Sequence, residues 1–146
     1  MTLSDFKHYV ETGIVKKQTP NPERALSLIK ESSAKKQYLS VSIKNIPKGE
    51  MSPNFIVDYC YDMLIELIRA KMLIDGYNSG KSHEAEVSYM RVIGFSEADT
   101  RFMDEVRYFR NGTKYYGTLL NNEYAGKVLE FSDKLYPLLK KILNEK

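Results

Sequence analysis

The chain has 146 residues, of which 42% are hydrophobic and 28% are charged. This composition is typical of one globular domain and excludes a disordered, collagen-like or membrane-embedded chain. The net charge of +3 allows an anionic partner without requiring one. Because Cys60 is the one cysteine, a disulfide framework is excluded, and we expect a buried, unreactive thiol in a reducing compartment.

The start of the chain carries charged side chains, among them Asp5, Lys7 and Glu11. It therefore lacks the continuous apolar segment of a secretory signal. No apolar run approaches the roughly 18 residues that a membrane span needs. We expect a soluble, cytoplasmic protein that does not associate with membranes.

Residues 1–19 are predicted to form a short helix and a linker that precede the main domain. An amphipathic helix is expected from Leu3 to Thr12, before a glycine that ends it. The basic linker that follows is expected to be flexible. Residues 20–146 are predicted to form one helical bundle.

Two N-cap signals predict the starts of the first two long helices. Asn21 is followed by a proline, which is favourable at the first helical position because its missing N–H costs nothing there. Apolar residues at helical spacing then predict a helix over residues 22–45. Ser52, also followed by a proline, precedes a wide apolar stripe that predicts a central helix over residues 55–74.

Further caps predict two helices in the second half of the chain. Ser82 is expected to cap a short helix over residues 83–92. Ser96, with Asp99 three residues later, resembles a capping box and opens a helix that Gly117 ends.

A last helix is expected over residues 122–143, with Leu138 on its inward face and Pro137 interrupting its middle. No segment shows the sustained alternation and turn signals of a hairpin. The sequence therefore predicts an all-α protein, an up-down-up-down four-helix bundle with extra short helices.

Residues 107–117 concentrate side chains that suit nucleotide binding. Arg107, Arg110 and Lys114 share one flank of the helix and are expected to form a basic ridge suited to phosphate. Neighbouring tyrosine rings offer surfaces on which bases can stack. These rings are Tyr108, Tyr115 and Tyr116. A solvated helix face has the same pattern, so that alternative stays open.

Three short motifs together resemble the HEPN family, in particular its small stand-alone archaeal members. They are Asn-Pro-Glu-Arg-Ala at residues 21–25, Ser-His-Glu at residues 82–84, and Arg110 and Asn111 followed by Tyr115, Tyr116 and Gly117. The resemblance covers about residues 20–144. It implies a four-helix up-down bundle that forms a homodimer.

The resemblance also implies a nucleotide- or RNA-associated binding module. Many HEPN domains are metal-independent ribonucleases, and others are partners of minimal nucleotidyltransferases, so a nucleotidyltransferase partner in a toxin-antitoxin-like pair is one expectation. The residues expected to contact phosphate or ribose are Arg107, Arg110, Asn111 and Lys114. No cofactor is predicted, and no metal site, because His and Cys residues at ligand spacing are lacking.

Ribonuclease members of the family carry an arginine, a polar residue and, about one turn later, a histidine that lines a cleft at the dimer interface. Arg110 and Asn111 match the first two positions, but Tyr115 and Tyr116 stand where the histidine is expected. Tyrosine is a poor general base near neutral pH because its pKa is about 10. A ribonuclease with this degenerate motif and a pure interaction scaffold are the alternatives, so the sequence leaves open whether the protein is an enzyme.

His83 is a second candidate acid or base. It lies in the first turn of the helix predicted over residues 83–92. If the fold brings it near Arg110, the two form a conceivable acid/base pair. The alternative is a structural histidine at a helix start. For Arg110 and Asn111 we expect an accessible cleft and not the packed interior.

Overall fold

The computed structural model describes residues 3–47, 49–115, 117 and 119–144, and the side chains of residues 114 and 115 lie outside this description. The helices are α1 (Phe6–Glu11), α2 (Pro22–Asn45), α3 (Pro53–Asp75), α4 (His83–Val92), α5 (Glu97–Tyr115) and α6 (Asn122–Asn144). Two short strands, β1 (Lys16–Lys17) and β2 (Tyr77–Asn78), pair antiparallel. The all-α prediction is confirmed. Within the described ranges, no helix has the length and apolar character of a membrane span.

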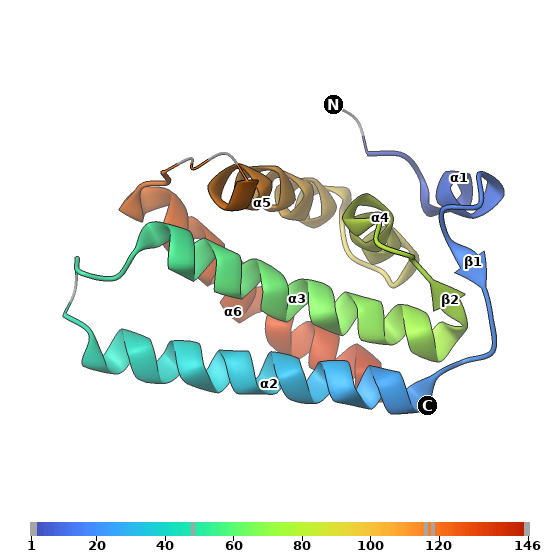
Figure 1. Cartoon of the computed structure of the whole chain (residues 1–146), viewed down its shortest axis with the longest axis horizontal. Helices are drawn as coiled ribbons and strands as arrows, with labels where there is room; N and C mark the ends of the chain where they lie inside the picture. The colour runs from blue at the N-terminus through green and yellow to red at the C-terminus, as the bar shows by residue number, and fades with distance from the viewer. Residues whose placement is uncertain (1–2, 48, 116, 118, 145–146) are drawn as a thin grey trace.

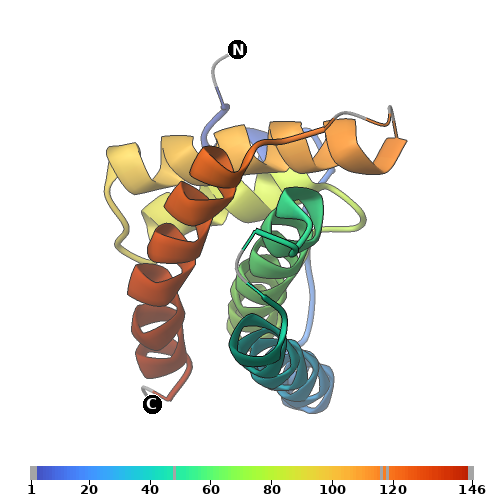
Figure 2. The ribbon, with the colours of Figure 1, turned by 90° about the vertical axis from the view of Figure 1, so that its left-hand side faces the viewer.

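α3 is the central helix of the fold and packs against α2, α4, α5 and α6. In Figure 1, α2 runs from right to left, whereas α3 and α6 run from left to right. α4 and α5 lie side by side in a layer above these helices, and α5 crosses them at a large angle (Figure 2). α3 is therefore covered on several sides, as its wide apolar stripe predicted.

Among the described residues, side-chain caps begin five of the helices. The capping residues Asn21, Ser52, Ser82, Ser96 and Asn121 accept hydrogen bonds from the backbone N–H groups of Arg24, Phe55, Ala85, Asp99 and Tyr124, at distances of 2.8–3.4 Å. Each cap satisfies a donor that the first helical turn leaves without a partner. α2 and α4 begin and end at the predicted residues.

The prediction of a flexible basic linker is wrong. β1 pairs with β2, and Gln18 N donates a hydrogen bond of 2.8 Å to Gly76 O just beyond α3. Phe6, Tyr9 and Val15 are buried in the same hydrophobic core as the long helices. The N-terminal segment is therefore held in place by apolar contacts and by backbone hydrogen bonds.

The inward face of α6 differs from the prediction at one position. Leu138 is 44% exposed, and its neighbour Leu139 is fully buried in its place. Counting from the buried Leu135, spacings of three and four residues are both close to one helical turn of 3.6 residues, and the packing of α6 against α3 buries the residue four positions along. α6 continues through Pro137.

Candidate functional site

Arg110 lies inside the protein, at the junction of α5 and α3. Only 7% of the residue is exposed. The expectation that Arg110 lies in an accessible cleft is therefore wrong for the single chain. Its Nη2 donates a hydrogen bond of 3.0 Å to Asp62 Oδ1 on α3, and its guanidinium carbon lies 5.6 Å from the ring centroid of Tyr61. Among the described residues, its Nε is a buried donor with no hydrogen-bond partner. Such a donor is uncommon in folded proteins, because leaving it unpaired costs about 1–3 kcal/mol.

Arg107 is also buried, with 8% of the residue exposed. Its Nε donates to Asp104 Oδ1 at 2.8 Å, and its Nη1 lies 3.7 Å from Glu84 Oε1 on α4. Arg107 and Arg110 are therefore buried arginines whose carboxylate partners are partly exposed. The exposed basic ridge expected from their spacing is not formed by these two side chains.

His83 faces the same cluster from the first turn of α4. Its Nδ1 lies 2.9 Å from the hydroxyl oxygen of Tyr61, and the two rings stack with 5.8 Å between centroids and an interplanar angle of 12°. The hydroxyl either donates or accepts, depending on which imidazole nitrogen carries the proton. Tyr61 thus contacts both His83 and Arg110, so the structure brings the two candidate residues to one tyrosine ring.

Burial is the main cause that lowers the pKa of His83, and the cations Arg69 and Arg110 lower it further, against the opposing effect of Glu86. The pKa of Tyr61 is raised, chiefly by burial. At neutral pH the imidazole is therefore uncharged and Tyr61 keeps its proton.

A second ion pair ties α4 to α3 beside this cluster. Arg69 Nη2 donates to Glu86 Oε1 at 2.9 Å, and Ser79 Oγ donates to Glu86 Oε2 at 2.7 Å. Glu86 is buried, whereas Arg69 is partly exposed. These bonds fix the start of α4, and with it the position of His83.

The charges of the cluster nearly cancel. Its cations are Arg69, Arg107 and Arg110, and their carboxylate partners are Asp62, Glu84, Glu86 and Asp104. Three positive and four negative groups leave a formal charge of −1 when His83 is neutral. We call this set, together with Tyr61 and His83, the Arg110 cluster.

The other predicted site residues are distributed differently. Asn111 is half-buried, and the predicted stacking residue Tyr108 is 63% exposed. The side chains of Lys114 and Tyr115, and Tyr116 as a whole, lie outside the described residues. The hypothesis that Tyr115 or Tyr116 takes the place of the histidine in the ribonuclease motif therefore concerns side chains outside the described part of the structure.

Tyr61, Asp62 and Arg69, all on α3, are members of the cluster that the sequence did not indicate. A signal for Asp62 was present, because Asp58, Asp62 and Glu66 lie one helical turn apart in an otherwise apolar helix. Two members of this polar stripe bind α5: Asp62 pairs with Arg110, and Asp58 Oδ1 accepts a hydrogen bond of 2.8 Å from Thr113.

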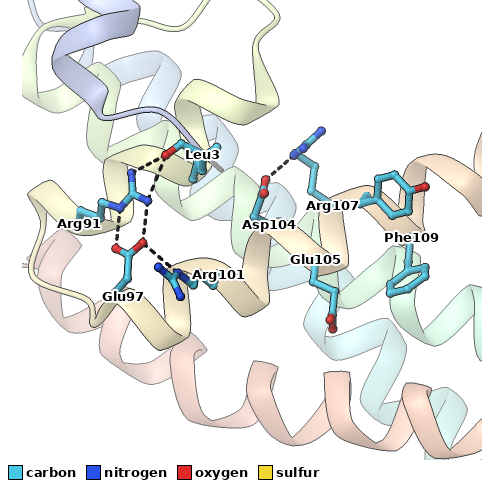
Figure 3. A pocket seen from close by; sticks show the side chains of 9 residues that line it. Leu3, Arg91, Glu97, Arg101, Asp104, Glu105, Arg107 and Phe109 are labelled. Atoms are coloured by element: carbon cyan, nitrogen blue, oxygen red, sulfur yellow. Dashed lines mark hydrogen bonds and ion pairs between the residues drawn. The ribbon is translucent and has the colours of Figure 1, made fainter. Parts of the chain in front are cut away.

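A hollow of about 810 Å³ borders the cluster on the α5 side. Figure 3 shows Arg107 turned toward Asp104 at one side, and Arg91 and Arg101 both bonded to Glu97 at the other. The arginines of this hollow are thus also paired with carboxylates. In the described part of the chain, no group of three or more His, Cys, Asp and Glu side chains is placed to hold a metal ion.

Comparisons of the chain with protein families, curated proteins and solved structures gave no match. The resemblance to HEPN domains stays a prediction from short motifs.

Proposed function

We propose that the protein is a nucleotide- or RNA-binding module of the HEPN type and that Arg110 is its anchor. In this proposal it works as a homodimer, and a nucleotidyltransferase is its partner in a toxin-antitoxin-like pair. The supporting observation is the buried Nε of Arg110, which has no hydrogen-bond partner among the described residues. A phosphate or ribose oxygen would supply the missing acceptor.

The surroundings of Arg110 are consistent with such a ligand. Asn111 lies half-buried next to Arg110 on the same helix and offers an amide group. Tyr61 and His83 place two stacked rings beside the guanidinium group. The Nε and Nη2 edge of a guanidinium group has the geometry to bind two oxygens of one phosphate.

Calorimetric titration with ATP and with short single-stranded RNA tests the proposal. Binding to either is expected, with a loss of at least about tenfold in affinity for Arg110→Ala, which corresponds to about 1.4 kcal/mol. Arg101→Ala is the matched control, because this arginine is on the same helix and 75% exposed. It should leave the affinity unchanged.

Salt dependence gives an additional measurement. Because the arginines of the cluster are already paired, few counterions are released on binding, and affinity should fall only weakly as salt increases. If Arg110→Ala does not fold, the half-buried Asn111→Ala tests the same site. No binding of ATP or RNA by the wild-type protein would overturn the proposal and leave the interaction scaffold as the remaining interpretation.

A ribonuclease is the second candidate, and the contact between Tyr61 and His83 favours it. With Nδ1–H donating to Tyr61, Nε2 of the neutral imidazole has a lone pair that can accept the proton of a ribose 2′-hydroxyl. Arg110 would stabilise charge on the phosphate. In this version His83 replaces the histidine that the α5 motif lacks. Cleavage of labelled RNA in EDTA that is lost in both His83→Asn and Arg110→Ala would support it, and intact RNA would reject it.

A further inference from the structure

The net charge of the Arg110 cluster determines what must accompany the binding of an anionic ligand. With neutral His83 the cluster has a formal charge of −1, because three arginines face four carboxylates. An anion that bound beside Arg110, which is itself largely buried, would make the site more negative. A compensating positive charge is therefore needed when the anion binds.

His83 is suited to supply this charge. Its ring contacts Tyr61, and the charged groups that act on it are Asp62 and Arg69 of α3, Glu86 of α4 and Arg110 of α5. Arginine side chains are protonated at all relevant pH values. Imidazole is the side-chain group whose ordinary pKa lies between about pH 5 and 8.

We propose that His83 is a binding residue of the Arg110 cluster and takes up one proton when a singly charged phosphodiester binds. This inference rests on the proposed nucleotide-binding function and names the ligand chemistry of that site. In the complex, Nδ1–H of the imidazolium donates to the Tyr61 hydroxyl, and Nε2–H becomes a donor for a phosphate oxygen. Arg110 Nε donates to the same phosphate group.

The charge count favours a diester over a monoester. One proton gained with one singly charged anion leaves the formal charge of the cluster at −1, as it was before binding. A phosphate monoester has about two charges at neutral pH, so the same proton would not compensate it. The site should therefore prefer an internal phosphate of RNA to the terminal phosphate of a mononucleotide.

The geometry supports a role for Tyr61 as the positioning residue. Its hydroxyl is the partner of His83 Nδ1 at 2.9 Å, and its ring contacts both the imidazole and the guanidinium group. A tyrosine hydroxyl both donates and accepts, so it satisfies the neutral and the protonated imidazole. The ring position need not change when the proton arrives.

Calorimetric titration with the dinucleoside monophosphate UpU tests the inference. Its diester does not ionise between about pH 5.5 and 8, so any proton uptake belongs to the protein. Titrations in buffers of different ionisation enthalpy should show close to one proton taken up per UpU at neutral pH. Affinity should increase by up to about tenfold for each unit by which pH is lowered. UMP should bind more weakly than UpU.

His83→Asn should bind UpU more weakly than the wild type near neutral pH, with no proton uptake and with a flat pH profile. His8→Asn is the matched control, because His8 is the other of the two histidines and is exposed on α1. It should behave as the wild type does. Histidine NMR signals of the wild-type protein provide a readout that needs no folded variant: the His83 signal should titrate at higher pH in the presence of UpU.

Each outcome decides the inference. UpU binding without proton uptake, or an unshifted His83 signal in the complex, would overturn it while leaving the proposed function standing. A pH profile of UpU binding in His83→Asn equal to that of the wild type would also overturn the inference and leave the proposed function standing. Absence of UpU, ATP and RNA binding at every pH would overturn both.

Discussion

Tyr61 and His83 form the contact on which the candidate site depends: the tyrosine hydroxyl lies 2.9 Å from Nδ1 of the imidazole, and the rings stack at 12°. The two residues are on different helices, α3 and α4. Because the guanidinium group of Arg110 approaches the same tyrosine ring from α5, one side chain joins three helices. Variants of this tyrosine should therefore affect both stability and the chemistry of the site.

Tyr61→Phe is expected to lower the free energy of unfolding by about 1–3 kcal/mol. The substitution removes the hydroxyl and leaves a partly buried imidazole nitrogen without its partner. Urea denaturation measures the change. Tyr108→Phe is the control, because this tyrosine is largely exposed, and it should change the stability by less than about 0.5 kcal/mol. Equal effects of the two variants would contradict a structural role for the Tyr61 hydroxyl.

Glu86→Gln should be among the most destabilising polar substitutions, at about 3–5 kcal/mol. Glu86 is buried and accepts hydrogen bonds from Arg69 and Ser79, so neutralising it leaves the partly buried charge of Arg69 uncompensated. Glu123→Gln removes a carboxylate from an exposed pair on α6 and should have little effect. Thermal or urea unfolding that ranked the two variants alike would refute this expectation.

Stability should fall when pH decreases through about 6.5, the ordinary pKa of histidine. Burial lowers the pKa of His83 in the folded protein, so the unfolded chain binds a proton at a pH where the folded one does not. This group therefore adds stability above about pH 6.5 that is lost on acidification, with a slope of at most about 1.4 kcal/mol per pH unit. Urea denaturation between about pH 5 and 7 should show this slope in the wild type. His83→Asn should lack it, and an unchanged slope in that variant would assign the effect elsewhere.

Cys60 should be unreactive while the protein is folded. The residue is fully buried, and burial raises the pKa of its thiol to about 12. Because thiolate is the reactive form, a thiol reagent such as DTNB should react at the rate at which the chain opens. One thiol per chain should react rapidly in urea. Rapid labelling of the native protein would contradict this placement.

Gly76→Ala should destabilise the fold by more than Gly94→Ala. Both glycines have positive φ, of 88° and 101°, so each alanine variant is strained by about 1–2 kcal/mol. At Gly76 an added Cβ would also lie 2.8 Å from Gln18 O, whereas at Gly94 nothing lies within 4 Å. The difference between the two variants in urea denaturation measures how tightly the N-terminal segment is held against the end of α3. Equal losses would indicate that this segment moves aside easily.

Helix positions were predictable because their signals act over a few residues. Asn21 and Ser52, each followed by a proline, begin α2 and α3 through side-chain bonds to N–H groups three residues away. The inward face of α6 was less predictable: Leu138 and Leu139 lie on adjacent sides of the helix, and the crossing geometry selects which of them is buried.

The sequence by itself determined the helices and their caps, and it indicated Arg110 and His83 as candidate site residues. Only the tertiary structure decided that Arg110 is buried against Asp62, that carboxylates neutralise the neighbouring arginines, and that Tyr61 joins Arg110 to His83. The physical reason is the distance along the chain over which each kind of interaction acts. Caps and apolar spacing depend on neighbours within one or two turns, whereas these contacts depend on how α3, α4 and α5 cross, and that is decided by packing of the whole core.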